Sequence, residues 1–216
     1  AAFAICQAFY DHGGDERTRQ GFGDWIWKHA GAGITTATEL LFQPFPLPFY
    51  EDAVAAPDFP LRVRAYHVTN PDRHTVHPPG AGDDDFAVAG IKIIADGSPF
   101  VGNIWLTRPY LSTEVTVKGM GLAEGHTGHM SYEADELARL IEDYVALGWQ
   151  MSVHTQGDRT VDAVLDCYER ALERHPRDDH RFRLEHCATM RQDQIERANR
   201  LGVVSSFFLA HLYYWG

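Results

Sequence analysis

Cysteine is scarce in this sequence. Cys6, Cys167 and Cys187 are the only three among 216 residues. An odd and widely spaced set does not suit the disulfide framework of a small secreted domain. It is typical of a reducing compartment, so we expect a cytoplasmic protein. Cys187 directly follows a histidine in a predicted strand, and we expect its thiol to point into the core, away from that histidine.

Long apolar runs and an excess of positive charge are also missing. No stretch approaches the roughly 18 consecutive apolar residues that could span a bilayer. The formal net charge of −11 argues against nucleic acid or an anionic membrane as a partner. The first residues lack the basic segment of a signal peptide. With 44% hydrophobic and 23% charged residues, the composition is that of an ordinary globular protein with material for a sizeable core.

Strand-like apolar segments alternate with amphipathic helical segments along the chain. The six predicted strands cover residues 34–41, 61–68, 88–95, 148–154, 181–186 and 203–209. The predicted helices lie within residues 1–32, 51–56, 131–147, 159–172 and 195–201. This alternation predicts an α/β fold with a parallel sheet. Ser131 is expected to be the N-cap of its helix.

Two segments interrupt the alternation. Residues 69–85 are rich in proline, glycine and aspartate, where a barrel would need a crossover helix. Either a mobile loop lies here, or residues are missing from the chain at this point. Residues 100–130 form a long excursion, in which Trp105 is expected to belong to a substrate-binding lid. His126 and His129 lie in a glycine-rich part of it, which favours contact with solvent or substrate over metal binding.

Two histidines end neighbouring predicted strands. His154 and His186 are 186 − 154 = 32 residues apart, about the length of one strand-helix-strand unit. In a right-handed parallel unit both would emerge at the carboxyl ends of adjacent strands, where catalytic groups collect in β/α barrels. A lone histidine is more often a satisfied polar residue, but a pair in register favours a metal site, because imidazole suits zinc and similar ions.

Lys92 stands among isoleucines in the predicted strand 88–95, which should be buried on both faces. A buried ammonium group is costly unless it is paired, neutralised or modified. Two interpretations remain open. The lysine pairs with a carboxylate such as Asp96 or Glu185, or it is a reactive neutral amine, since burial lowers the pKa of lysine. Such an amine can take up carbon dioxide to form a carbamate, whose oxygens can bridge two metal ions.

Other polar residues near the strand ends have simpler explanations. Asp158 either orients His154 or caps the following helix, and capping is the favoured interpretation. Glu185 alternates away from the histidine beside it and is expected to pair with a lysine or arginine behind the sheet. His67 ends the strand 61–68, where it either lines the substrate site or has a core or loop role.

Three ordered motifs resemble signatures of the amidohydrolase superfamily. They are residues 91–98 (IKIIADGS), 148–159 (GWQMSVHTQGDR) and 183–187 (RLEHC). The resemblance is closest to amidohydrolase family 3, the branch of N-substituted formamide deformylase and the exoenzyme-regulatory-protein-like hydrolases. Residues 33–36 (GITT) resemble its second barrel strand, and residues 201–216 resemble the same branch, so the resemblance spans nearly the whole chain.

The resemblance implies a metal-dependent (β/α)8 TIM barrel with a small β-sandwich built from the chain ends. His154 and His186 would be metal ligands from strands five and six. Lys92 would be the strand-four lysine with a direct part in catalysis, carboxylated where the centre holds two ions. His211, just past strand seven, would approach the substrate as a catalytic or binding residue. The implied cofactor is one or two divalent ions, zinc first among them.

The sequence departs from that pattern in two places. The His-x-His pair of the first strand should precede Gly33, where only His12 and His29 occur. The strand-eight aspartate, a metal ligand and general base, would lie beyond Gly216. We therefore expect all 216 residues to form the central part of one incomplete barrel, strands two to seven. Gln156 stands where asparagine is more usual.

Three functions follow from these observations. The favoured one is a metal-dependent hydrolase of amide, formamide or related C–N bonds, which acts on a small-molecule substrate and is compatible with assembly into a homo-oligomer. The second is a non-catalytic truncated barrel that binds small molecules or partner proteins. The third is a structural piece that completes a barrel with other chains, because the outer strands of an open sheet demand covering.

Overall fold

The protein is described by a computed structural model, in which residues 15–42, 53–69, 75 and 77–215 are described. Six strands form one sheet in the order β1-β2-β3-β4-β5-β6, and every neighbouring pair is parallel. The strands are β1 (Thr36–Phe42), β2 (Arg62–Val68), β3 (Phe86–Ile94), β4 (Gln150–Thr155), β5 (Arg183–His186) and β6 (Val204–Phe207). Parallel strands in sequential order make an incomplete (β/α)8 barrel, as the sequence predicted.

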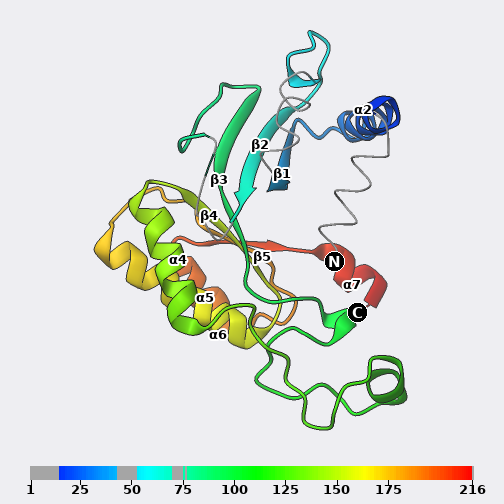
Figure 1. The fold of residues 1–216 in the computed structure, drawn as a ribbon, viewed down its shortest axis with the longest axis vertical. Coiled ribbons are helices and arrows are strands. Elements are labelled where there is room, and N and C mark those ends of the chain that lie inside the picture. The colour runs from blue at the N-terminus through cyan, green and yellow to red at the C-terminus, as the bar shows by residue number, and fades with distance from the viewer. Residues whose placement is uncertain (1–14, 43–52, 70–74, 76, 216) are drawn as a thin grey trace.

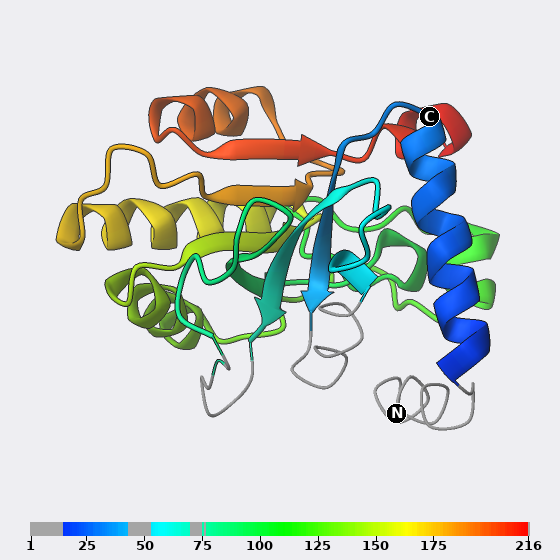
Figure 2. The same cartoon turned by 90° about the horizontal axis from the view of Figure 1, so that it is seen from above.

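Helices cover the outer face of the second half of this sheet (Figures 1 and 2). The described helices are α2 (Asp15–Gly31), α4 (Ala134–Ala146), α5 (Asp158–Arg174), α6 (Gln192–Arg200) and α7 (Leu209–Trp215). A 3-10 turn (Pro99–Val101) and a π-helical turn (Val115–Gly119) lie in the excursion between β3 and α4. The predicted segments 1–14 and 51–52 lie outside the described residues.

An apolar stripe binds α4 and α5 to the sheet. In α5 the buried positions Val161, Val164, Leu165 and Tyr168 recur at three- and four-residue steps. They pack in one cluster with Met151 and with other strand residues that face the helices. Burial of each such side chain contributes about 1.5–3 kcal/mol, which explains why these helices form where the sequence pattern predicts them.

Alternation along the strands separates two faces of the sheet. Ile91, Ile93, Val153 and Leu184 are fully buried in the helix-covered core. Their neighbours in the chain must therefore face the opposite side, the concave interior of the barrel. That interior face carries the polar residues Lys92, Ser152, His154, Arg183 and Glu185, which follow the registers Lys92↔Ser152↔Arg183 and Ile94↔His154↔Glu185.

Several boundaries differ from the sequence prediction. The helix expected at Ser131 begins at Ala134, with Glu133 at its N-cap. Ser131 instead donates its backbone N–H to the carbonyl of Ala95 at 2.8 Å, which ties the end of the excursion to β3. Between β2 and β3 the described residues 77–85 contain turns and an isolated bridge, but no helix.

The first half of the sheet is less covered than the second. Leu41 of β1 is exposed, and so are Trp25 and Trp27 of α2. At the other edge Val204 of β6 and Tyr213 of α7 are exposed. Among the described residues, no helix combines the length and the apolar character needed to cross a bilayer.

Candidate metal centre at the carboxyl ends of the strands

The two predicted histidines meet at the carboxyl ends of β4 and β5. The ring centroids of His154 and His186 lie 4.5 Å apart, with the ring planes at 65°. The ring of Phe208, just beyond β6, meets the His186 ring edge to face, with the two ring centroids 6.1 Å apart. The side-by-side arrangement that the 32-residue spacing predicted is therefore present.

His186 reaches this position through an unusual backbone. Register pairs His186 with Thr155 and Glu185 with His154, so regular alternation would point His186 toward the helices. Its φ of 76° and the φ of 52° at Cys187 are both left-handed, a conformation that costs non-glycine residues roughly 1–3 kcal/mol each. The departure from extended geometry turns the imidazole toward His154, and strain of this kind is common at functional sites.

The hydrogen bonds of His154 fix its tautomer. Its Nε2 lies 2.7 Å from the carbonyl oxygen of Gly97, and a carbonyl only accepts, so Nε2 carries the hydrogen. The Oδ1 of Asp96 lies 3.6 Å from the same nitrogen. Burial lowers the pKa of His154, against the opposing effects of Gly97 and Asp96. A neutral ring with Nε2 protonated presents Nδ1 as a lone-pair donor.

Lys92 lies on the same interior face, and the residue is 3% exposed. Among the described residues its Nζ has no hydrogen-bond partner. Burial lowers the pKa of Lys92 to about 8, and the charge of Glu185 limits the fall. The carboxylate partner that the sequence left open is thus Glu185, at electrostatic range. The alternative of a reactive neutral amine also agrees with this lowered pKa.

Glu185 is held by other groups. Its Oε1 lies 2.7 Å from Nε of Arg183 and accepts a 2.9 Å hydrogen bond from Ser152. Burial raises the pKa of Glu185, but Arg183, Lys92 and Ser152 together outweigh burial and bring it below the ordinary value. Glu185 therefore pairs with arginine as expected. The expected place behind the sheet is wrong, because Glu185 shares the interior face with His154 and Lys92.

Asp158 has neither of the roles that the sequence offered. It is the first residue of α5, whose N-cap is Gly157, and it makes no capping bond. Its Oδ1 accepts the backbone N–H of Thr107 at 2.8 Å, and its Oδ2 accepts from Arg191 at 3.1 Å. The carboxylate therefore joins the excursion to α5 and to the loop before α6.

Trp105 anchors the excursion beside the loop that follows His154. The guanidinium carbon of Arg159 lies 4.1 Å from the centre of its ring. The Arg159 N–H donates to the Trp105 carbonyl at 3.2 Å. His126 has an internal role in the same excursion, because its Nε2 lies 2.6 Å from the Gly102 carbonyl. His129 is exposed. A substrate-binding role for Trp105 remains a prediction.

His67 is not brought to the two histidines. It pairs in register with Ile91, which faces the helix-covered core. Its ring is 5.1 Å from Phe42 and 6.1 Å from Trp149. This placement favours the core role that the sequence left open. The backbone of His211 lies in α7, but its side chain is outside the part that the structure describes, so its expected role at the substrate remains a prediction.

Sequence reasoning missed Asp96 as a residue of this site. It lies two residues after the end of β3, is fully buried, and accepts backbone N–H groups from Gln156 at 3.0 Å and Gly157 at 2.8 Å. Its signal in the sequence is an acidic residue immediately after a buried strand segment and before Gly97, a pattern that we interpreted as a turn and as one of two carboxylates that could pair with Lys92.

The residues present fit a divalent ion in part. Two imidazoles and a buried, unbonded lysine nitrogen are the donor types expected there, with Nδ1 of His154 left available. Within the described ranges, no group of three or more histidine, cysteine, aspartate or glutamate side chains could hold a metal by itself. A tight zinc site needs three or four protein ligands, so the two imidazoles alone do not complete one, and Lys92 or another group would have to supply the rest.

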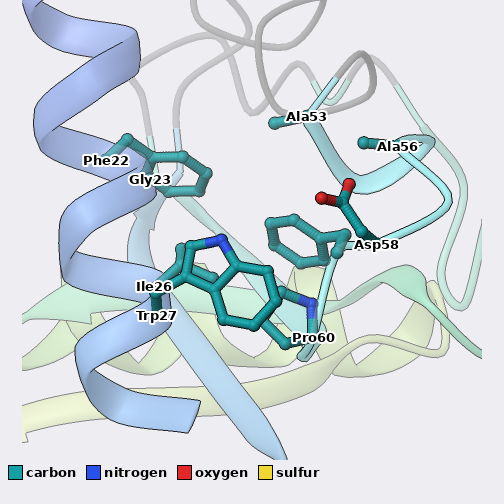
Figure 3. Close-up of a pocket in the computed structure, with 9 residues that line it drawn as sticks. Phe22, Gly23, Ile26, Trp27, Ala53, Ala56, Asp58 and Pro60 are labelled. Carbon is teal, nitrogen blue, oxygen red and sulfur yellow. The ribbon is translucent and has the colours of Figure 1, made fainter. Parts of the chain in front are cut away.

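A separate hollow of about 250 Å³ lies between α2 and residues 53–60. Figure 3 shows Phe22 and Trp27 of α2 facing Asp58 and Pro60 across it. Neither the histidine pair nor Lys92 lines this hollow.

Comparison with known proteins supports the motif analysis. The sequence model of one family, described as the amidohydrolase family, matches residues 4–216. No curated protein matches the sequence significantly.

Three solved structures resemble the fold. An uncharacterized metal-dependent hydrolase from Pyrococcus furiosus has a TM-score of 0.72 and 20% identity, over 99% of this chain and 43% of its own. An uncharacterized metal-dependent hydrolase from Pyrococcus horikoshii OT3 has a TM-score of 0.64 and 23% identity, over 88% of this chain and 37% of its own. A Xaa-Pro dipeptidase with bound methionine has a TM-score of 0.51 and 12% identity, over 88% of this chain and 46% of its own. This chain thus spans less than half the length of each.

Proposed function

This chain belongs to the amidohydrolase family, and from that premise we propose that it is the central part of a metal-dependent hydrolase. Its substrates are small molecules with an amide, formamide or related C–N bond. The observation that carries the proposal is the 4.5 Å contact between the rings of His154 and His186. It lies at the strand ends where β/α barrels keep their catalytic groups.

His154 and His186 would hold the ion, with Lys92 as a third group. A bound divalent ion would supply Lewis acidity, which polarises a scissile carbonyl and makes a water nucleophilic near neutral pH. The protein holds the neutral His154 ring with Nδ1 free to donate, through the hydrogen bond from Nε2 to Gly97. The desolvated Lys92 amine, with a pKa of about 8, is neutral in an appreciable fraction at neutral pH.

A neutral Lys92 amine could add to carbon dioxide. The nitrogen forms a new bond to the carbon as one C=O π bond opens, and it releases a proton to solvent. The product is a carbamate, whose single negative charge is shared by two oxygens. Such a group supplies the oxygen ligands that the two imidazoles do not. The buried Nζ has no hydrogen-bond partner in the part of the chain that the structure describes, which supports this proposal. Zinc, which accepts nitrogen and oxygen ligands, is the ion that we propose first.

The test combines metal analysis with activity. We would express the 216-residue chain and any longer protein that its gene encodes, without chelator, and measure bound metals by elemental mass spectrometry. A panel of N-formyl, N-acyl and carboxylic ester compounds would follow. Near-stoichiometric metal with hydrolysis of the C–N compounds supports the proposal. A metal-free protein that hydrolyses none of these compounds would contradict the proposal.

A second function has one observation in its favour. No cluster of three or more metal-binding side chains occurs among the residues that the structure describes, which suits a truncated barrel that binds small molecules or partners without catalysis. In that case the longer protein would also lack metal and activity. Binding of an unreactive amide analogue would then persist in a His154→Ala/His186→Ala double variant.

A further inference from the structure

We propose that Asp96 is a positioning residue, which fixes the orientation and tautomer of His154 and so presents Nδ1 to the metal. The inference rests on the proposed function, because presenting Nδ1 matters only if His154 binds a metal. Its geometry stands on the described residues alone.

Asp96 joins the turns that follow two strands. It comes two residues after Ile94, the last residue of β3, yet its carboxylate accepts N–H groups from Gln156 and Gly157, which follow β4. The side chain is fully buried. Nothing in the sequence distance of about 60 residues, 156 − 96 = 60, requires this contact. The carboxylate therefore acts as a clamp between the strand of Lys92 and the strand of His154.

The clamp acts on His154 from two directions. It fixes the turn after β4, which His154 enters, and it fixes the turn after β3, in which Gly97 supplies the acceptor for Nε2 at 2.7 Å. The Oδ1 of Asp96 itself lies 3.6 Å from Nε2. In its ionised form, the Asp96 carboxylate at this range favours a hydrogen on Nε2 over one on Nδ1.

A purely structural role would not need this charge. A neutral amide could accept an N–H from Gly157, and a buried carboxylate is costly without compensation. The compensation is two backbone N–H donors, those of Gln156 and Gly157, with the imidazole of His154 close by at 3.6 Å. Partners of this kind, behind a metal-binding histidine, set its tautomer and orientation, and losing one typically costs about 10–100-fold in metal affinity.

The test compares Asp96→Asn with Asp158→Asn. Asp158 is the matched control. It is also a buried carboxylate that accepts hydrogen bonds from a loop N–H and from an arginine side chain, but it does not contact His154. The proteins are labelled with 15N-histidine, kept metal-free, and the His154 signals are assigned by their loss in His154→Gln. Two-bond 1H–15N correlations then report the tautomer.

The wild-type protein should show His154 with its hydrogen on Nε2. Asp158→Asn should keep that state, and Asp96→Asn should shift a substantial fraction to Nδ1–H. A wild type with the hydrogen on Nδ1 overturns the proposal even if Asp96→Asn does not fold. An unchanged tautomer in a folded Asp96→Asn overturns it as well.

Cobalt(II) titration gives a second readout. Affinity should fall about 10–100-fold in Asp96→Asn and stay within about threefold in Asp158→Asn. Equal affinities in wild type and Asp96→Asn contradict the positioning role. If the wild type binds no cobalt, the proposed function fails, while the tautomer measurement still decides the role of Asp96.

Discussion

The rings of His154 and His186 lie 4.5 Å apart although their strand register would separate them. His154 pairs with Glu185, and His186 pairs with Thr155, a residue that is fully buried. Neighbouring residues of a strand point to opposite faces. The left-handed φ of 76° at His186 ends that alternation and turns the ring to the interior. The candidate metal centre therefore depends on a local backbone conformation as much as on the order of strands.

Replacing either histidine should remove most of the bound metal. We expect His154→Ala and His186→Ala each to weaken zinc binding by at least about 100-fold. Loss of a residue that only supports a ligand costs up to about 100-fold in metal affinity, and loss of the ligand itself should cost no less. Zinc affinity by competition with a chromophoric chelator is the measurement. His129→Ala is the control, because His129 is exposed on the excursion. An equal loss in His129→Ala would mean that surface histidines hold the metal.

Lys92 should destabilise the metal-free protein at neutral pH. Its pKa falls from 10.5 when unfolded to about 8 when folded, so the unfolded chain binds the extra proton between these values. The cost, about 3 kcal/mol, is fully present below pH 8 and disappears as the pH rises toward 10.5. Lys92→Met should raise the free energy of unfolding at pH 7, and the gain should vanish near pH 10.5.

The Lys92 experiment uses urea unfolding in carbonate-free buffer, with Lys118→Met as the control. The Lys118 side chain is 77% exposed and pairs with Glu114 of its own turn, so its removal should change stability by less than about 0.5 kcal/mol. A gain for Lys92→Met that does not depend on pH would show that the amine is not desolvated.

Glu185 should contribute stability that acid removes. Its folded pKa lies below the ordinary 4.5 because Arg183, Lys92 and Ser152 together outweigh burial. Its contribution is therefore present above pH 4.5 and is lost as the pH falls through the folded pKa. At pH 7, Glu185→Gln should cost about 2–3 kcal/mol, less than a fully buried pair because Arg183 is partly exposed. Unfolding curves from pH 7 to pH 3 should show the two proteins converging, and parallel curves would contradict this.

Gly157 should tolerate no side chain. A Cβ there would lie 2.1 Å from the carbonyl oxygen of Trp105, a backbone atom that cannot swing away. Gly157→Ala should therefore push the excursion off α5 and cost about 1–3 kcal/mol. Gly21→Ala is the control, since nothing lies within 4 Å of its Cβ, and a helix gains up to about 1 kcal/mol from this exchange. Thermal unfolding would measure both, and a stable Gly157→Ala would show that the excursion is not docked there.

The sequence by itself determined the elements and their order. The apolar period of α5 and the β-branched strand segments depend on neighbours a few residues away, so local pattern predicts them. The 32-residue spacing and the parallel order placed two histidines on adjacent strand ends. The buried lysine was evident because a charged residue interrupts a run of isoleucines.

Only the tertiary structure decided which side chains share a face. Pairing in register put Glu185 beside His154 and sent His67 to the core with Trp149. The left-handed residues at the end of β5 brought His186 back to the interior. The clamp of Asp96 on Gly157 joins positions 157 − 96 = 61 residues apart. Such contacts depend on strand register, twist and backbone exceptions, which are properties of the assembled sheet and not of any single segment.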